Sequence, residues 1–337
     1  MKKQILAGVL SATMIVGMGG VSVFAADGAD DKTYNIGICQ LVQHEALDAA
    51  TQGFKDAITE ELGDKVTFDE QNAQGDSNTC STIITDFVSD NVDLILANAT
   101  PALQAAAAGT ADIPILGTSV TEYGVALDLD DFDGTVGNNI SGTSDLAPLE
   151  DQAAMLNELF PDAKNVGLVY CSAEANSQYQ VDTVKAALEK LGYTCEYYAF
   201  SDSNDLSSVA TTAATESDVI YLPTDNTVAS NTEIINNICL PEKVPVIAGE
   251  EGICEGCGVA TGKMALKVLV DGEDISKMPI EYAPQFTKEY NPEICKELGI
   301  EVPDDYVAIG ADAEEETSGD DADAANDTAE KTTEEAE

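Results

Sequence analysis

The chain has 337 residues, of which 62 are acidic and 15 are basic, and its formal net charge is −47. Every basic residue is a lysine, since Arg is absent, and Trp is absent as well. A hydrophobic fraction of 44% can form a buried core, which excludes wholesale disorder, and the length suits roughly two domains. The acidic balance makes nucleic acid a poor partner. Without Arg, a carboxylate ligand must be held by backbone N–H, hydroxyl, amide or Lys groups.

The first 26 residues have the pattern of a secretory signal peptide. Lys2 and Lys3 precede an apolar run at 5–18, which is too short to span a bilayer and ends in small residues. No Cys precedes Cys39, so no lipid-anchor site is visible. We expect cleavage near Ala25 or Ala26 and an exported protein, periplasmic or extracellular and associated with the cell surface. A retained membrane anchor is the alternative.

From Tyr34 onward, short apolar runs alternate with amphipathic stretches. Strands are expected at 34–39, 65–70, 92–98 and 113–118, with helices at 46–62, 77–89 and 101–108 between them. The order restarts about 130 residues later, with strands at 165–171, 193–200, 217–223 and 244–249 and helices at 176–191, 205–214 and 226–239. A turn-rich stretch at 124–150 and a helix at 149–160 connect the two copies. Strands that alternate with helices of this length form parallel sheets.

The sequence therefore predicts an α/β protein with two similar doubly wound parallel-sheet domains and a ligand cleft between them. The expected N-terminal lobe covers 34–145, the C-terminal lobe covers 146–261, and segments at 262–310 return to complete the lobes. Residues 311–337 contain 12 acids against one Lys and almost no large apolar side chain. We expect a disordered tail there, with calcium buffering as an alternative role.

Candidate ligand-binding residues follow the strands, because ligands of parallel sheets bind at the carboxyl ends of the strands. In the first copy these residues are Gln40, His44, Asn98, Thr100, Ser119 and Val120. In the second copy they are Ser172, Glu174, Asn176, Ser177, Asp225, Asn226, Thr227 and Glu250. Hydroxyls and amides at helix starts favour an anion, and the acids favour an ammonium group, so the set suits a zwitterion. The alternative is that several of these residues are ordinary helix N-caps.

Asp225 is the expected partner of a ligand ammonium, because it stands between an apolar strand and a helix start. The alternative is that Asp225 only caps its helix, in which case Glu174 or Glu250 takes the role. Tyr123, Tyr170 and Tyr221 are close to strand ends and could offer ring faces to an apolar ligand side chain. Core packing is the preferred interpretation for Tyr170 and Tyr221.

The segments YNIGICQLVQHEALD, VDLILANATPALQAA, YLPTDNTVAS and IAGEEG carry a family resemblance. They resemble the ABC-transporter substrate-binding proteins of the tryptophan/tyrosine type, with the type I periplasmic-binding fold, over about 34–300. The resemblance implies an extracytoplasmic receptor that closes on a small ligand, an aromatic or other apolar amino acid. We expect it to be a monomer. Its partners would be an ABC permease and the ATPase of that permease. No cofactor is implied.

The sequence differs from related chains at Thr261, which runs directly into Gly262. Related chains continue from this point through a further strand and a Tyr-containing loop. The region normally carries the second crossover between the lobes. Either the hinge is shortened and works, or the receptor is damaged.

The chain has eight Cys, and we expect mostly free thiols because several lie in or beside predicted strands. Cys254 and Cys257 could form a redox pair or half a metal site, but a zinc site needs about four ligands, so a local disulfide or a reduced turn is expected. His44, the only His, is either a ligand contact or a turn residue. No catalytic motif is present, so we expect no enzyme, no metal and no cofactor. The alternatives are an exported thiol- or metal-handling enzyme that uses Cys254 and Cys257, and a ligand-sensor module of the same fold.

Overall fold

The computed structural model describes residues 32–249, 255–282 and 286–309. The expected signal peptide, the acidic tail, Glu250 and Cys254 lie outside these residues. The described residues up to Phe286 belong to one compact unit, and those from Thr287 onward belong to a second, small one.

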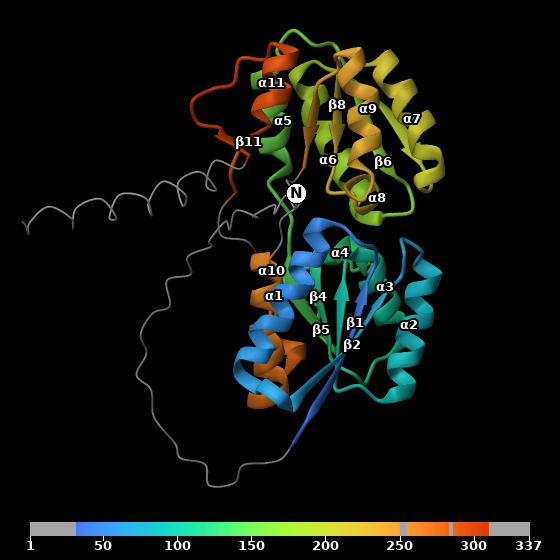
Figure 1. Ribbon diagram of the computed structural model, residues 1–337, viewed down its shortest axis with the longest axis vertical. Helices are drawn as coiled ribbons and strands as arrows, with labels where there is room; N and C mark the ends of the chain where they lie inside the picture. Colours follow the sequence, from blue (N-terminus) through green and yellow to red (C-terminus); the bar gives the residue numbers. More distant parts are fainter. Residues whose placement is uncertain (1–31, 250–254, 283–285, 310–337) are drawn as a thin grey trace, which may run out of the picture. The chain divides into compact units, whose positions relative to one another are not determined.

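A six-stranded parallel sheet organises the first lobe, which we define as residues 32–144 and 255–282. Its strands, in sheet order, are β10 (Glu281–Tyr282), β5 (Ile140–Ser144), β4 (Ile115–Val120), β3 (Leu94–Asn98), β1 (Tyr34–Gln40) and β2 (Val66–Asn72). Helices α1 (Glu45–Leu62) and α10 (Glu255–Leu266) pack on one face, and α2 (Ser77–Asp90) and α3 (Thr100–Gly109) pack on the other (Figure 1). Buried apolar side chains fill both interfaces. Because helices cover both faces, the ligand-accessible part of the sheet is its edge.

The second lobe, residues 149–249, repeats this arrangement with four parallel strands. Their order is β7 (Thr194–Phe200), β6 (Asn165–Cys171), β8 (Val219–Leu222) and β9 (Val246–Ala248). Helices α5 (Leu149–Leu159) and α6 (Ala175–Leu191) cover one face, and α7 (Ser203–Glu216) and α9 (Thr232–Glu242) cover the other. The prediction of two doubly wound parallel sheets is confirmed.

The single helix expected at 226–239 is two helices, α8 (Asn226–Ala229) and α9. The break lies at Ser230 and Asn231. The Asn231 side chain donates a hydrogen bond to the Thr227 carbonyl, 2.8 Å away, where a continuous helix would use a backbone N–H. Short polar side chains compete with helical hydrogen bonds in this way.

Strand β5 lies inside the stretch that the sequence indicated as turns. Its residues are ISGTS, without the apolar run that marks the other strands, yet all five positions are buried. A side chain at Gly142 would overlap the carbonyl oxygen of Gly117 and the hydroxyl of Tyr123. The strand therefore needs small residues at its centre, and this need removed the apolar signal from the sequence.

The return to the first lobe occurs earlier than the boundary expected at Thr261. Helix α10 begins at Glu255 and packs against α1, β4 and β5, so it already belongs to the first lobe. Thr261 is fully buried inside this helix, and its hydroxyl bonds the Thr143 hydroxyl at 2.8 Å. The junction at Thr261 and Gly262 is thus part of a helix rather than a hinge.

Two glycines one helical turn apart, Gly258 and Gly262, allow α10 to approach α1 closely. A Cβ at Gly258 would overlap the Ala50 carbonyl, and one at Gly262 would lie 2.8 Å from the Ala57 Cβ and from the Phe54 carbonyl oxygen. Glycines at this spacing let helix backbones come into contact.

The small unit contains α11 (Pro292–Leu298) and the parallel strands β11 (Glu289–Tyr290) and β12 (Val307–Ala308). Asn291 caps α11 by accepting hydrogen bonds from Glu293 N and Ile294 N. Lys288 and Asp305 form an ion pair at 3.0 Å. The short α4 (Tyr123–Ala126) of the first lobe and three further single turns, Gly63–Lys65, Lys267–Asp271 and Ile275–Lys277, complete the described elements.

Gly258→Ala is expected to destabilise the protein. The added methyl group cannot fit beside the Ala50 carbonyl, so α10 must move, which typically costs about 1–3 kcal/mol in a packed core. Thermal and urea unfolding should show the loss. Lys263→Ala, at an exposed position of the same helix, is the control and should stay within about 0.5 kcal/mol. An alanine variant as stable as the parent would contradict this close packing.

Candidate functional site

Two neighbouring strands of the first lobe and the helix that follows one of them carry three polar side chains whose hydrogen-bonding atoms are buried and unpartnered. These atoms are Asn98 Oδ1 at the end of β3, Thr100 Oγ1 at the start of α3 and Ser119 Oγ near the end of β4. The three residues are at most 7% exposed. Since β3 and β4 are adjacent and parallel, their carboxyl ends meet at one edge. All three residues were predicted from the sequence.

The backbone turns sharply at this edge. Ala99, directly after β3, has a φ of 93°, and Ser119 has a φ of 52°. Non-glycine residues rarely adopt positive φ, and such conformations cluster at ligand sites. The turn at Ala99 leads straight into α3, so that the N–H groups of the first turn of α3 start beside the strand end.

Asp145 is a further residue of this edge, and the apolar pattern of the sequence does not indicate it. It follows β5 directly, and its Oδ1 atom is buried without a partner. Burial raises the pKa of Asp145 to about 6, although a hydrogen bond with Thr121 opposes the rise. The same rule that selected the other residues, a polar side chain just after a strand, finds Asp145 once β5 is recognised as a strand.

In the second lobe, Asn176 presents the same feature in the first turn of α6. Its side-chain nitrogen donates to the Thr224 carbonyl at 2.9 Å, which leaves Oδ1 buried and unpartnered. Gln180 fixes the same loop, because it donates to the Thr224 carbonyl and accepts from the Thr224 N–H. Ser177 is fully buried beside them and reaches the same carbonyl at 3.5 Å.

Gln40 supports the first lobe's edge instead of presenting free groups. Its side-chain oxygen accepts from Thr51 at 2.6 Å, and its nitrogen donates to Asp48 at 2.7 Å. Thr51 in turn accepts from the Asn98 side-chain nitrogen at 2.9 Å. This chain of hydrogen bonds orients Asn98 so that its oxygen is the atom left over.

Glu174 and Asp225 form a buried pair of acids in the second lobe. Glu174 is 3% exposed and accepts four hydrogen bonds, from the N–H groups and side chains of Asn226 and Thr227. Asp225 is 2% exposed, and its two oxygens accept from Cys171 N at 2.7 Å and Val228 N at 3.0 Å. Asp225 is thus the N-cap of α8, as the alternative interpretation held. Its pairing with a ligand ammonium stays a prediction.

His44 meets Asn226 across the lobes. The His44 Nε2 and Asn226 Oδ1 atoms lie 3.1 Å apart. Because Asn226 donates its amide to Glu174, its oxygen is the acceptor, and His44 carries the proton on Nε2. Burial lowers the pKa of His44, while the bond to Asn226 and the nearby acids Glu174 and Asp48 oppose this shift.

Several other candidates lie apart from these groups. Ser172 is exposed and donates to the Phe200 carbonyl at 3.0 Å, and Val120 belongs to the hydrophobic core. The three tyrosines are buried, with Tyr123 bonded to the Thr143 carbonyl and Tyr221 to Gln152. Core packing therefore accounts for these tyrosines. Glu250 lies outside the described residues.

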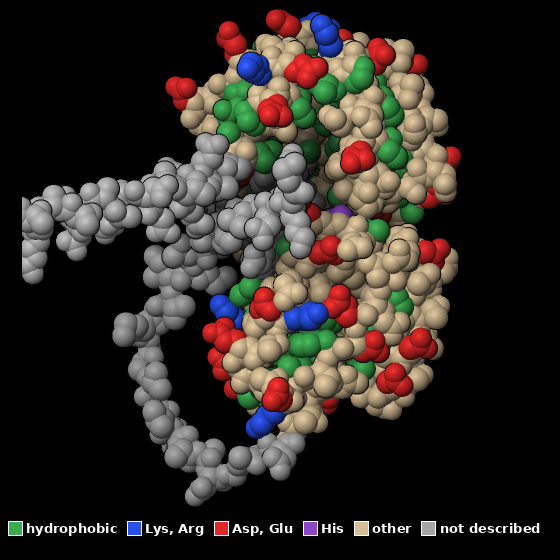
Figure 2. Space-filling model, in the orientation of Figure 1, with side chains coloured by type: hydrophobic (Ala, Val, Ile, Leu, Met, Phe, Trp, Pro, Cys, Tyr) green, Lys and Arg blue, Asp and Glu red, His purple; other side chains and the backbone are tan. Residues whose placement is uncertain are grey.

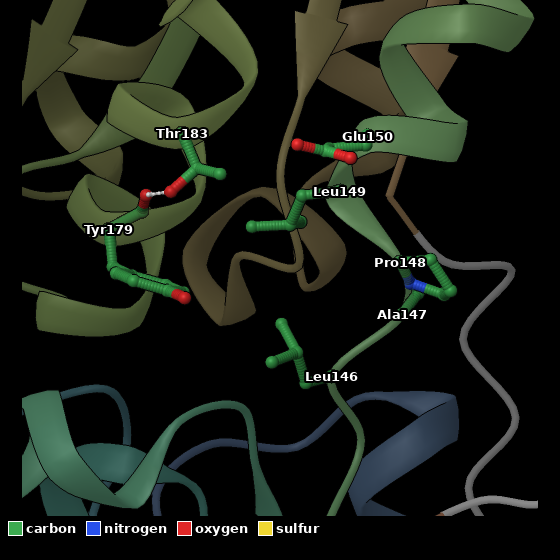
Figure 3. Close-up of a pocket in the computed structure, with 7 residues that line it drawn as sticks. All are labelled: Leu146, Ala147, Pro148, Leu149, Glu150, Tyr179 and Thr183. Atoms are coloured by element: carbon green, nitrogen blue, oxygen red, sulfur yellow. Dashed lines mark hydrogen bonds between the residues drawn. The ribbon is translucent and has the colours of Figure 1, made fainter. Parts of the chain in front are cut away.

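A crevice of about 280 Å³ lies beside the linker that leaves β5. Its walls are Leu146–Glu150, Tyr179 and Thr183 (Figure 3). The Tyr179 ring and the side chains of Leu146 and Leu149 point toward one another across it. None of the residues with unpartnered atoms lines this crevice.

No described lysine balances the buried acids. The ion pairs of the described residues join surface groups, for example Lys55 and Glu70 at 2.7 Å, and acidic side chains are scattered over the visible face (Figure 2). No lysine contributes to the pKa shifts of Asp145 and Asp225. A cationic group of a ligand would therefore find buried negative charge without a protein counter-ion.

Two parallel α/β lobes with buried polar groups at their strand ends define a binding protein of the type I periplasmic-binding class. The family model described as ABC transporter substrate binding protein matches residues 35–314. The chain belongs to this family. Its members are binding proteins, which confirms the expectation that the chain is not an enzyme.

Similar proteins include a tyrosine-binding protein of Clostridioides difficile (strain R20291), 34% identical over 320 residues, or 88% of this chain and 91% of the relative. A structure of an ABC domain in complex with L-Trp from Streptococcus pneumonia is 31% identical, with a TM-score of 0.77, and covers 81% of this chain and 97% of the other. The ligand-free, open structure of a substrate-binding protein with adhesive properties from Clostridium difficile is 37% identical, with a TM-score of 0.61, and covers 82% and 99%.

Substrate-binding proteins of ABC transporters are extracytoplasmic, and no helix of the described residues is long and apolar enough to cross a membrane. Within the same residues, no group of three or more His, Cys, Asp or Glu could hold a metal ion. Cys39, Cys80, Cys171, Cys195 and Cys239 are buried thiols. The expectation for the pair of Cys254 and Cys257 stays a prediction.

Asp225→Asn is expected to flatten the pH dependence of stability. Burial and the nearby Glu174 carboxylate raise the pKa of Asp225 from 3.8 to about 7. Between these values the folded protein holds a proton that the unfolded chain has released, so the contribution of Asp225 to the free energy of unfolding falls as the pH rises. Asparagine does not titrate. Urea unfolding from about pH 4.5 to 8 should therefore show a smaller decline in the variant.

Asp76→Asn is the control for this series. Asp76 is the exposed N-cap of α2, and hydrogen bonds lower its pKa below 3.8, so its contribution is lost only at more acidic pH. The free energy of unfolding of Asp76→Asn should therefore decline with rising pH as it does in the parent. An unchanged decline in Asp225→Asn would show that Asp225 does not hold a proton in the folded state.

Proposed function

We propose that this chain is the receptor of an ABC importer for an aromatic amino acid, with tyrosine and tryptophan as the first candidates. The observation that carries the proposal is the set of buried, unpartnered atoms at the strand ends. They comprise three acceptor oxygens, on Asn98, Asn176 and Asp145, and two hydroxyls, on Thr100 and Ser119.

This inventory complements an α-amino acid. An ammonium group has three N–H donors and no acceptor, and a carboxylate accepts without donating. The three oxygens therefore suit the ammonium group, and the two hydroxyls suit the carboxylate, together with the N–H groups at the start of α3. Since Arg is absent, hydroxyl and N–H donors are also the means that the chain has for holding a carboxylate.

The names of the similar proteins support an aromatic side chain, since one binds tyrosine and another was crystallised with L-Trp. We further infer that the chain is exported by its first 26 residues and acts as a monomer. It would deliver its ligand to an ABC permease with an ATPase. Closure of the lobes would add affinity, because only the closed state contacts the ligand from both sides.

Isothermal titration calorimetry with the full chain tests the ligand class. L-Tyrosine and L-tryptophan should bind about 10- to 100-fold more tightly than L-alanine, the gain expected from burying an aromatic ring. Indole-3-propionate and tryptamine, which lack the ammonium and the carboxylate respectively, should both bind more weakly than L-tryptophan. Failure of every aromatic amino acid to bind at about millimolar concentration would contradict the proposal.

Thr100→Val and Thr51→Val separate binding from folding. The Thr100 hydroxyl has no partner in the protein, so its removal should leave the unfolding midpoint nearly unchanged. A hydrogen bond to a carboxylate is worth about 1.5–3 kcal/mol, so the same change should weaken L-tryptophan binding by about that amount. Thr51→Val breaks the bonds to Gln40 and Asn98 and should lower stability by about 1–3 kcal/mol. A Thr100 variant that binds like the parent would remove Thr100 from the site.

A further inference from the structure

We propose that Asp145, at the point where the chain leaves the first lobe, is the partner of the ligand ammonium group. The inference rests on the proposed binding of an amino acid and assigns the residue that recognises its cationic end. It differs from the expectation that Asp225 takes this role.

The position of Asp145 favours contact with the ligand. Strand β5 is paired with β4, so Asp145 follows the strand next to the one that carries Ser119. Its backbone N–H donates to the Val120 carbonyl at 3.3 Å, which ties it to the carboxyl end of β4. The unpartnered atoms of Asn98, Ser119 and Asp145 thus lie at the ends of three consecutive strands of one sheet.

The hydrogen bonds of Glu174, Asp225 and Asp145 distinguish the three acids. Both oxygens of Asp225 accept from backbone N–H groups, and the two oxygens of Glu174 accept four hydrogen bonds. Asp145 keeps Oδ1 buried and unpartnered. A buried carboxylate oxygen without a donor is costly, so a ligand ammonium gains most by pairing with this atom.

The groups that shift the pKa values of Asp145 and its neighbour Tyr123 include no cation. Thr121 shares a hydrogen bond with Asp145, and Cys257 of α10 and Tyr282 of β10 act together with Asp145 on Tyr123 of α4. Glu281, the other residue of β10, pairs with Lys267 at 3.6 Å. Glu122, which begins α4, is a further acid near Tyr282. A ligand ammonium would therefore be the cation that Asp145 lacks.

Asp145 also stands at the start of the linker 146–148, which enters α5 of the second lobe. An ammonium held there would be contacted from the first lobe at the pivot between the lobes. Binding would then fix the direction of the linker as well as the ligand. This placement makes Asp145 a link between recognition and closure.

The test compares Asp145→Asn with the parent by calorimetry, using L-tryptophan, L-tyrosine and indole-3-propionate. Loss of the charge pair should lower the affinity for both amino acids by about 30-fold or more. Indole-3-propionate has no ammonium group, so its affinity should not fall. Asp93→Asn, at the opposite edge of the same sheet, is the matched control for removal of one negative charge and should bind as the parent does.

The pH dependence of the affinity for L-tryptophan gives a second readout. A purely structural role of Asp145 would not change it. Burial raises the pKa of Asp145 to about 6, and a bound ammonium should lower it, so the amino acids must displace a proton below that pH. The affinity of the parent for L-tryptophan should fall about tenfold from pH 7 to pH 5. Asp145→Asn should lack this fall, whereas Asp93→Asn should keep it.

The outcomes are distinct. If the parent binds no aromatic amino acid, the proposed function fails. If the parent binds but Asp145→Asn binds equally well with the same pH dependence, only the assignment of Asp145 is overturned. Loss of binding in Asp225→Asn, with Asp145→Asn unaffected, would return the role to Asp225. Equal losses for L-tryptophan and indole-3-propionate in Asp145→Asn would also overturn the assignment, because they indicate a general structural defect.

Discussion

The parallel order of the strands is the constraint on which the rest of the molecule depends. The carboxyl ends of parallel strands all lie at one edge of the sheet, and helices cover both of its faces. A ligand can therefore reach the sheet only at this edge. The residues after β3, β4 and β5 are therefore brought together by topology, although they are far apart in the chain. Asn98, Ser119 and Asp145 carry buried, unpartnered atoms because each stands at such an end.

Negative charge is the second constraint, and it favours a cationic group on the ligand. The chain has no Arg and a formal net charge of −47, and the acids of its second lobe are buried beside one another without a described counter-ion. Glu174 and Asp225 are tolerated because N–H groups and amides surround them. Such a protein gives a cation a favourable place and an anion only hydroxyl and N–H donors. A zwitterion satisfies both halves of this arrangement.

Periodicity was sufficient to predict most of the fold, because buried parallel strands are continuous apolar runs. It failed at β5, where the packing of Gly142 against Gly117 and Tyr123 requires small residues and erases that run. The same failure concealed Asp145, since a residue can be placed after a strand only when the strand is recognised. The boundary expected at Thr261 came from the resemblance to related chains, whereas in the structure Thr261 lies inside α10, which contacts α1 through Gly258 and Gly262.

The candidate site was predicted in outline, and the limits have a physical cause. A sequence shows which polar residues follow strands, but not which of their atoms other groups already occupy. Asp225 and Asp145 look alike in the sequence, yet backbone N–H groups take both oxygens of one and leave an oxygen of the other. The ligand can shift the lobes only through contacts that differ between their states. An acid whose hydrogen bonds are already complete offers little such difference, whereas an unpartnered oxygen beside the linker offers a large one.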